Sequence, residues 1–305
     1  MRFFIFRVFM KTLLIGEASG VHRNLKKGLI NLGCDVEHYV NYSEGYQNRT
    51  YDNSFSKCSP GLWGGLRRNI EPYYNILKLD NYDVINFTNT ITAVHGKYSK
   101  YKDLGLIRKK AKILSYYGVG CDEIGIIRRS NIDLKYSPCH GCLSSNDTLS
   151  KDCEKLLNNN YRKSVELVNK HFDVLASSMI EYDHIGSIIK DKNFGKIPLP
   201  VDVESIKYQP YKLKNKLNIV HAPTRRGFKG SDVIIRAINK LSKVRNDFNF
   251  KIIENVSYER YLDIMNNADI VIDQVYSQSP GMSALEMMSA GKIVFTGSTE
   301  PVSYT

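Results

Sequence analysis

Short apolar runs alternate with segments of helical periodicity along almost the whole chain. The amino-terminal part has such runs at residues 12–15, 35–40, 83–87, 112–116 and 172–176. The carboxyl-terminal part has them at residues 217–222, 248–254, 270–273 and 292–296. Strands that alternate with helices form parallel sheets, because each parallel connection has to cross back over the sheet. The sequence therefore predicts an α/β fold with two Rossmann-like domains.

A domain boundary is predicted near residue 205. Residues 196–216 combine prolines, charges and little periodicity, which is typical of a junction between domains. A chain of 305 residues is long enough for two domains. We expect them at 1–205 and 206–305, with the carboxyl ends of both sheets facing one cleft. The second domain is expected to be incomplete, because the chain stops soon after the run at 292–296.

The net charge indicates which partners the chain attracts. Lys and Arg number 43 and Asp and Glu 31, so the formal charge is +12. Such a field favours nucleic acid, nucleotide phosphates or an anionic membrane surface. No segment approaches the roughly 20 apolar residues that cross a bilayer. Residues 1–9 are interpreted as an upstream extension that packs loosely or contacts lipid, and the chain is predicted to be cytoplasmic.

A helix is predicted after a polar, tyrosine-rich stretch at 41–60, which we interpret as one long functional loop. The helix follows from apolar residues at helical spacing, at positions 62, 66, 70, 73 and 77. Arg67 and Arg68 lie beside this apolar row. The helix faces either the acceptor or a membrane, or else it is partly buried with a solvated basic face.

A basic segment, HAPTRRGFKGSD at 221–232, is the best candidate for an anion site. The glycine loop with Gly16 and Gly20 is not G-x-G-x-x-G, and no P-loop motif occurs. Arg225, Arg226 and Lys229 fall between a predicted strand and helix, where cations can face a diphosphate, with Ser231 as the helix N-cap. A solvated basic loop is the alternative. Gly16 and Gly20 indicate close backbone approach to a ligand, or a tight turn.

A second segment, residues 273–297, runs from a strand through a proline-glycine turn into a helix that carries Glu286. A carboxylate one turn inside a helix can accept hydrogen bonds from paired sugar hydroxyls. Residues 217–297 resemble the nucleotide-sugar site of GT-B glycosyltransferases of the group 1 type, family 4. That pattern has two glutamates separated by seven residues, then A-x-x-x-G and a strand. Gln278 and Glu286 stand at the two glutamate positions.

The resemblance implies a role for each matched residue. Glu286 would hold the donor ribose, and Lys229 with Arg225 or Arg226 would neutralise the diphosphate. Backbone amides at Pro280, Gly281 and Met282 would approach the transferred sugar or its phosphate, and Gly16 and Gly20 would also contact the donor. Transfer would proceed with retention and without a metal or other cofactor. Gln278 departs from the family, since glutamine keeps an acceptor oxygen and loses the charge.

Two polar residues at predicted sheet ends are candidates for the acceptor side. His95 follows the run at 83–87, and Asp122 follows the run at 112–116. Both could contact sugar hydroxyls, or could be solvated loop residues.

Four cysteines form a cluster in a predicted insertion at 121–153 of the first domain. Cys139 and Cys142 form a C-x-x-C pair, flanked by Cys121 and Cys153. Four thiolates can hold a structural zinc that fixes a segment with little core of its own. Thiols without a metal are the alternative.

The expected function is transfer of a sugar from a nucleotide-sugar donor to a glycan or lipid-linked acceptor in polysaccharide or cell-envelope biosynthesis. Peripheral contact with the inner face of the cytoplasmic membrane fits the charge. Two alternatives stay open: a non-catalytic glycosyltransferase-like protein, suggested by Gln278, and a zinc-knuckle nucleic-acid-binding protein, against which the absence of helix-turn-helix and RRM patterns argues.

Overall fold

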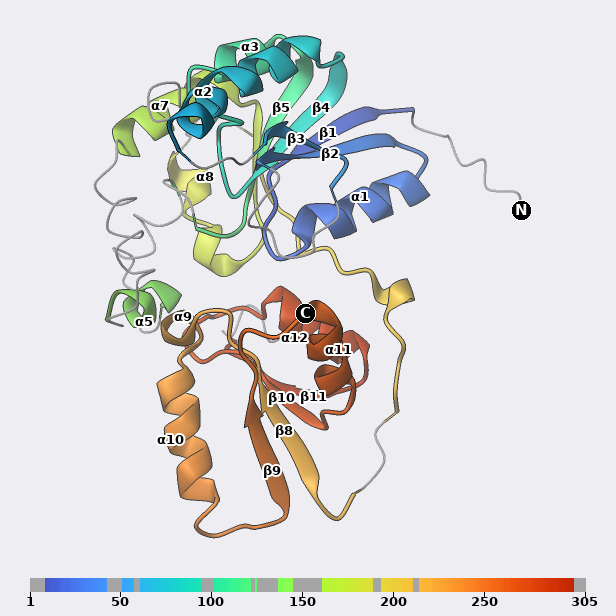
Figure 1. The fold of residues 1–305 in the computed structure, drawn as a ribbon, viewed down its shortest axis with the longest axis vertical. Helices are drawn as coiled ribbons and strands as arrows, with labels where there is room; N and C mark the ends of the chain where they lie inside the picture. The colour runs from blue at the N-terminus through green and yellow to red at the C-terminus, as the bar shows by residue number, and fades with distance from the viewer. Residues whose placement is uncertain are drawn as a thin grey trace. The chain divides into compact units, whose positions relative to one another are not determined.

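A computed structural model describes residues 9–42, 51–57, 61–94, 101–121, 124, 137–144, 161–188, 193–210 and 214–298 (Figure 1). These residues divide into two compact units. The first contains the described residues up to 124 and those from 161 to 200. The second contains residues 137–144 and the described residues from 201 onward.

The first unit is built on a parallel seven-stranded sheet. Its order is β3-β2-β1-β4-β5-β6-β7. The strands are β1 (Lys11–Ile15), β2 (Asp35–Tyr42), β3 (Asn53–Ser56), β4 (Tyr82–Thr88), β5 (Ala111–Gly118), β6 (Val174–Ser177) and β7 (Asn193–Lys196). The chain winds outward in both directions from the β1–β4 pair, which is therefore the topological switch point of this sheet.

Helices connect these strands. They are α1 (Val21–Asn31), α2 (Gly61–Lys78), α3 (Leu104–Arg108), α7 (Tyr161–His171) and α8 (Ile185–Ile188), with a 3₁₀ turn at Ile180–Tyr182. The central strands are apolar on both faces, as a parallel sheet covered by helices requires. Leu13, Leu14 and Ile15 of β1 are all buried.

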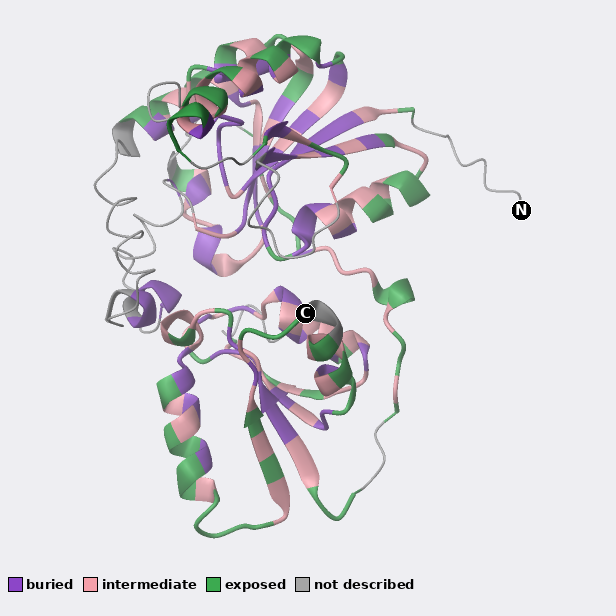
Figure 2. Cartoon of the chain, in the orientation of Figure 1, coloured by how far each residue is buried: buried purple, intermediate pink, exposed green. Residues whose placement is uncertain are grey.

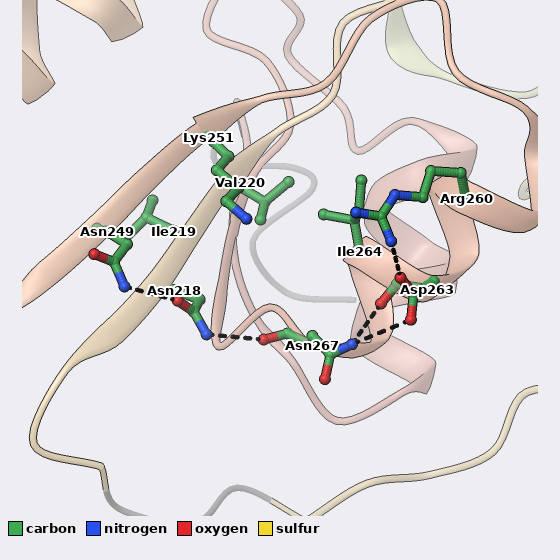
Figure 3. Close-up of a pocket in the computed structure, with 9 residues that line it drawn as sticks. All are labelled: Asn218, Ile219, Val220, Asn249, Lys251, Arg260, Asp263, Ile264 and Asn267. Atoms are coloured by element: carbon green, nitrogen blue, oxygen red, sulfur yellow. Dashed lines mark hydrogen bonds and ion pairs between the residues drawn. The ribbon is translucent and has the colours of Figure 1, made fainter.

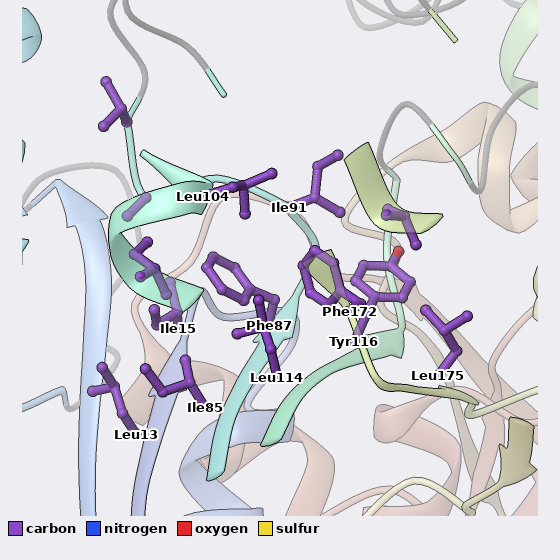
Figure 4. Close-up of a cluster of buried hydrophobic side chains, with 14 of the residues drawn as sticks. Leu13, Ile15, Ile85, Phe87, Ile91, Leu104, Leu114, Tyr116, Phe172 and Leu175 are labelled. Atoms are coloured by element: carbon purple, nitrogen blue, oxygen red, sulfur yellow. The ribbon is translucent and has the colours of Figure 1, made fainter. Parts of the chain in front are cut away.

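The core of the first unit is centred on aromatic residues of the middle strands (Figure 4). Phe172 packs edge-on against Phe87 and Tyr116, with ring centroids 5.6 and 6.4 Å apart. Edge-to-face pairs of this kind add to the stabilisation that apolar burial gives. Phe87 and Tyr116 lie near the carboxyl ends of β4 and β5, so this core packs against both strand ends.

The second unit contains a parallel four-stranded sheet with the order β11-β10-β8-β9. The strands are β8 (Leu217–His221), β9 (Phe248–Ile252), β10 (Ile270–Ile272) and β11 (Ile293–Phe295). The helices are α5 (Pro138–Ser144), α9 (Arg226–Lys229), α10 (Ser231–Leu241), α11 (Tyr258–Asn266) and α12 (Met282–Ser289), with a 3₁₀ turn at Val203–Ser205. The switch point of this sheet lies between β8 and β10.

Both faces of the second sheet carry helices. Ile234 and Ile238 of α10 pack with Ile219 on one face. Met265 of α11 and Met287 of α12 pack with Val220 and Val271 on the other. At one edge, β11 leaves Ile293 and Phe295 exposed.

Each strand predicted from an apolar run is present in the structure, within two residues of its expected start. Two strands were missed, and both lie at the edges of the first sheet. Their sequences, NSFS in β3 and NFGK in β7, are short and mostly polar, so they carry little apolar signal. The stretch at 41–60 is consequently not one loop, since β2 extends to Tyr42 and β3 lies within it.

The cysteine-bearing residues 137–144 belong to the second unit, whereas the sequence predicted them in an insertion of the first domain.

Candidate functional site

The basic segment and the proline-glycine segment meet at the carboxyl end of the second sheet. The Val275 N–H donates to the carbonyl oxygen of Lys229 at 3.1 Å. The Lys229 Nζ donates to Asp273 Oδ1 at 2.6 Å. Lys229 follows β8 and Asp273 follows β10, so this ion pair spans the switch point of the sheet. Open α/β sheets bind ligands at such points.

Asp273 joins three elements through one carboxylate. Besides the ammonium on Oδ1, its Oδ2 accepts the Gly281 N–H at 3.2 Å and the Thr296 hydroxyl at 3.3 Å. The side chain of Asp273 is only 2% exposed and that of Lys229 only 11%. A buried carboxylate needs such partners, because burial without them costs several kcal/mol. Asp273 therefore fixes α9, the start of α12 and the end of β11 relative to one another.

The turn before α12 is shaped by its own polar side chains. Gln274 donates to the carbonyl oxygen of Ser279 at 2.8 Å, and the Ser277 hydroxyl donates to the same oxygen at 3.0 Å. Gly281 is the N-cap of α12, with extended backbone. The first-turn amides of a helix have no partner within the helix and carry its positive dipole end. The start of α12 lies beside the Lys229 ammonium, since a Cβ added to Gly281 would lie 3.5 Å from the Lys229 Nζ.

The remaining predicted residues of the second segment lie around this turn. Pro280 and Gln278 are half-buried in it, Met282 is the buried first residue of α12, and Glu286 is half-buried one turn further on. The structure places them on one loop and helix with Gly281.

The two arginines of the basic segment differ in their contacts. Arg225 precedes α9 and its guanidinium lies 4.2 Å from the centroid of the Phe228 ring. Arg226 pairs with Glu254 through two hydrogen bonds, from Nε at 2.8 Å and Nη2 at 2.5 Å. Those hydrogen bonds lower the pKa of Glu254. Three cations that the sequence grouped together therefore point to different partners.

Ser231 does not cap α10, so that prediction was wrong. Gly230 occupies the N-cap position in the left-handed region, with φ of 71°. The Ser231 hydroxyl lies 2.8 Å from His221 Nε2, and His221 Nδ1 lies 2.8 Å from the carbonyl oxygen of Ile272. Both side chains are buried, and burial lowers the pKa of His221. A neutral ring donates from Nδ1 and accepts the hydroxyl at Nε2, which draws Ser231 away from the backbone.

The helix with the C-x-x-C pair packs directly on the basic segment. A Cβ added to Gly141 of α5 would lie 2.2 Å from the carbonyl oxygen of Gly227 in α9 and 2.7 Å from the ring of Tyr276. The same ring lies 3.1 Å from the position of a Cβ on Gly230. Cys139 and Cys142, on either side of Gly141, are buried. The C-x-x-C pair and the basic segment, which are far apart in the sequence, thus pack against each other in the structure.

The zinc prediction stays a prediction. Cys153 lies outside the described residues, and Cys121 follows β5 in the first unit. Within the described part of the chain, no three His, Cys, Asp or Glu residues gather as metal ligands would. His95 and Asp122, predicted for the acceptor side, also lie outside the described residues.

The glycine loop of the first unit has a structural explanation. Gly16 and Gly20 have φ of 90° and 86°, and a Cβ on Gly16 would lie 2.3 Å from the carbonyl oxygen of Thr88. The Glu17 carboxylate is buried and accepts the N–H groups of Gly20 at 2.9 Å and Arg23 at 3.2 Å. The turn therefore requires glycine whether or not a ligand binds, and donor contact at this loop stays a prediction.

Two buried histidines beneath this loop were missed. His22 Nδ1 and His38 Nε2 lie 2.9 and 2.8 Å from the carbonyl oxygen of Gly16, and the two rings stack edge to face at 5.6 Å. Burial, followed by the neighbouring His38, lowers the pKa of His22 to about 4. One signal existed in the sequence, because His38 falls between Val36 and Val40 on the inward side of β2.

A pocket of about 270 Å³ lies elsewhere in the second unit (Figure 3). It is bounded by β8, β9 and α11. Its polar side chains bond to one another: Asn249 to Asn218, Asn218 to the Asn267 backbone, and Asn267 to Asp263. None of the predicted site residues lines it. It is distinct from the Lys229–Asp273 site.

No protein-family model and no curated protein matches the sequence. Solved structures match its fold. Sucrose-phosphate synthase from Thermosynechococcus elongatus superposes with a TM-score of 0.53 at 11% identity, over 93% of this chain and 80% of its own. The catalytic domain of starch synthase IV from Arabidopsis thaliana, bound to ADP and acarbose, gives 0.55 at 11% identity, over 94% and 82%.

The glycotransferase of kitacinnamycin gives a TM-score of 0.50 at 8% identity, over 96% of this chain and 82% of its own. These structures are glycosyltransferases of the GT-B fold. The predicted fold class, α/β with two parallel sheets of the GT-B type, is confirmed.

Proposed function

We propose that the chain is a retaining glycosyltransferase of the group 1 type, which transfers a sugar from a nucleotide-sugar donor to a glycan or lipid-linked acceptor. The observation that carries the proposal is the Lys229–Asp273–Gly281 constellation at the switch point of the second sheet. In it, the Lys229 ammonium and the N–H of Gly281, which lies in the tight turn at the start of α12, both donate to the Asp273 carboxylate. A role in polysaccharide or cell-envelope biosynthesis, on the inner face of the cytoplasmic membrane, is part of the proposal.

In this proposal the site acts on the charge that builds on the departing diphosphate. The Lys229 ammonium and the amides at the start of α12 stabilise that charge, because fixed donors need no reorganisation during the reaction. Glu286 holds the ribose hydroxyls, while Arg225 and Arg226 supply further positive charge. No step needs a metal or another cofactor.

Asp273 affects how Lys229 would bind the donor diphosphate. The donor diphosphate has to share Lys229 with a carboxylate that already lies 2.6 Å from its Nζ. Opposite charges held together keep the ammonium in one position, which reduces the cost of ordering it when the donor binds.

The experiment is a melting-temperature panel with ADP-, UDP- and GDP-sugars. One donor should raise the melting temperature by roughly 5 °C at saturation, because it binds only the folded state. Glu286→Ala and Lys229→Ala should each remove most of that shift, measured against their own unliganded baselines. Lys240→Ala, which changes an exposed lysine of α10, is the matched control. If Glu286→Ala and Lys229→Ala respond like the parent, the site is assigned wrongly.

A non-catalytic glycosyltransferase-like protein is the second candidate, and Gln278 is the observation that favours it. Such a protein would bind the donor without releasing its nucleoside diphosphate. Release of nucleoside diphosphate, measured for the parent and for Gln278→Glu, separates the two. Release by the parent supports the enzyme, and binding without release by the parent supports the second candidate.

A further inference from the structure

Helix α2 turns an apolar face toward solvent. Six large side chains are between 51% and 94% exposed: Leu62, Trp63, Leu66, Ile70, Tyr74 and Leu77. Its inward side is covered, since Gly64, Pro72 and Ile76 are buried and Asn75 donates to the carbonyl oxygen of Phe55 in β3. Figure 2 colours much of the helix as exposed. The residues that attach α2 to the first unit therefore lie on the opposite side of the helix from the exposed face.

The exposed residues follow a definite order around the helix. At about 100° per residue, the sequence of positions is Leu62, Leu66, Leu77, Ile70, Trp63, Tyr74, Arg67 and Lys78. Aliphatic residues come first, aromatic residues next and cations last. The Lys78 Nζ lies 4.1 Å from the centroid of the Tyr74 ring, so the aromatic and cationic zones adjoin.

This order matches the chemical layers of a lipid surface. Aliphatic side chains enter the acyl boundary, Trp and Tyr occupy the headgroup level, and Lys and Arg reach the phosphates. A protein partner would require no such gradation. We infer that the α2 face docks on an anionic lipid bilayer, with α2 lying in the plane of the surface.

The charges of the helix favour an anionic surface in particular. Arg67 and Lys78 border the exposed face, and the single carboxylate of the helix, that of Glu71, lies 3.6 Å from Arg67. The whole chain carries +12. Each basic residue near an anionic leaflet contributes about 1 kcal/mol of attraction. Among the described residues, no helix combines the length and apolarity that crossing a bilayer requires.

The sequence contains a single tryptophan, and it lies on this face. Emission from Trp63 therefore reports directly on the face. Vesicles of phosphatidylcholine with phosphatidylglycerol should shift the emission to shorter wavelength and sediment the protein, with binding at least about tenfold stronger than to pure phosphatidylcholine. High salt should weaken the binding, because it screens the charges.

Variants make the test specific. Leu66→Ser/Ile70→Ser should lose vesicle binding, while Leu32→Ser, which changes the exposed leucine directly after α1, should keep it. Arg67→Gln/Lys78→Gln should lose the preference for anionic vesicles. The donor-induced melting shift of Leu66→Ser/Ile70→Ser should equal that of the parent, so failure here and failure of the proposed function are distinguishable.

Two results would overturn the inference. One is Trp63 emission and sedimentation that do not change with either vesicle. The other is a shift of Trp63 emission to shorter wavelength when the protein concentration is raised without vesicles, together with a dimer in analytical sedimentation. A second copy of the chain would then cover the face.

Discussion

The Lys229 ammonium and the Asp273 carboxylate form an ion pair at 2.6 Å in which both side chains are almost fully buried. The pair joins the segment that follows β8 to the one that follows β10. Its partners on the second carboxylate oxygen are the start of α12 and the end of β11. One carboxylate thus holds together the residues from which the proposed donor site is built.

Asp273→Asn should destabilise the protein by about 3 kcal/mol, because it leaves a buried ammonium without its countercharge. The measurement is the free energy of unfolding in urea. Thr296→Val removes only one long hydrogen bond to the same carboxylate and should cost less than about 1 kcal/mol. Equal effects of the two substitutions would show that the ion pair contributes little.

Gly141→Ala should weaken the contact between α5 and α9. The added methyl group meets a backbone carbonyl at 2.2 Å, so the two helices have to separate. We expect a loss of roughly 1–3 kcal/mol of stability and a smaller donor-induced melting shift, since α9 carries Lys229.

Gly65→Ala is the matched control for that substitution. Gly65 also lies in a helix, and nothing lies within 4 Å of its added Cβ. Alanine there should be neutral or stabilise the protein by up to about 1 kcal/mol. If the donor raises the melting temperature of Gly141→Ala as much as that of Gly65→Ala, the contact between α5 and α9 does not affect donor binding.

His22→Gln should change how stability depends on pH. The native pKa of His22 is about 4 against an ordinary value of 6.5, so between these values the unfolded chain binds more protons than the native one. Its contribution is complete above pH 6.5 and falls by up to about 3 kcal/mol as the pH approaches 4. Urea unfolding at pH 7.5 and 5 should show a smaller loss of stability in His22→Gln than in the parent, and the loss that remains includes that of His221, whose pKa is also lowered by burial.

Asp103 acts in the opposite direction and provides the control. Burial raises the pKa of its carboxyl from 3.8 to about 6, although Thr92 and the Ala93 N–H donate to it. Its contribution therefore grows as the pH falls from 6 toward 4. The loss of stability on acidification should therefore be larger in Asp103→Asn than in the parent. Parallel pH profiles for the parent and both variants would contradict the assignment of these two groups.

One structural zinc per chain, held by Cys121, Cys139, Cys142 and Cys153, is the fourth prediction. Elemental analysis of protein purified without chelator measures it. Less than about a tenth of an equivalent would contradict it, because a four-thiolate site binds zinc tightly.

The sequence predicted the parts of the fold that are held by apolar burial. Strands such as β1 and β8 contain consecutive buried apolar residues, Leu13–Ile15 and Ile219–Val220, because parallel sheets are covered on both faces. The edge strands β3 and β7 were not predicted. Each has a neighbouring strand on one side only, and its short sequence contains few apolar residues. Pattern alone predicts the burial of apolar residues, and not which strands border a sheet.

For the candidate site, the sequence identified the two segments and not the residue that joins them. Asp273 reads as the ordinary polar end of a strand, and only the parallel order of β8 and β10 brings it to Lys229. Ser231 was misassigned for the same reason, since its partner His221 lies ten residues away across a turn. The contact between Gly141 and Gly227 joins parts of the chain far apart in sequence, which no local pattern can show.

Glu17 determines what the glycine loop of the first unit can accept. Its carboxylate already lies on the amides at the start of α1, the position that a phosphate takes at an open helix terminus. A second anion there would meet a like charge at close range and find these donors occupied. We therefore expect the start of α1 to repel a phosphate group rather than to bind it.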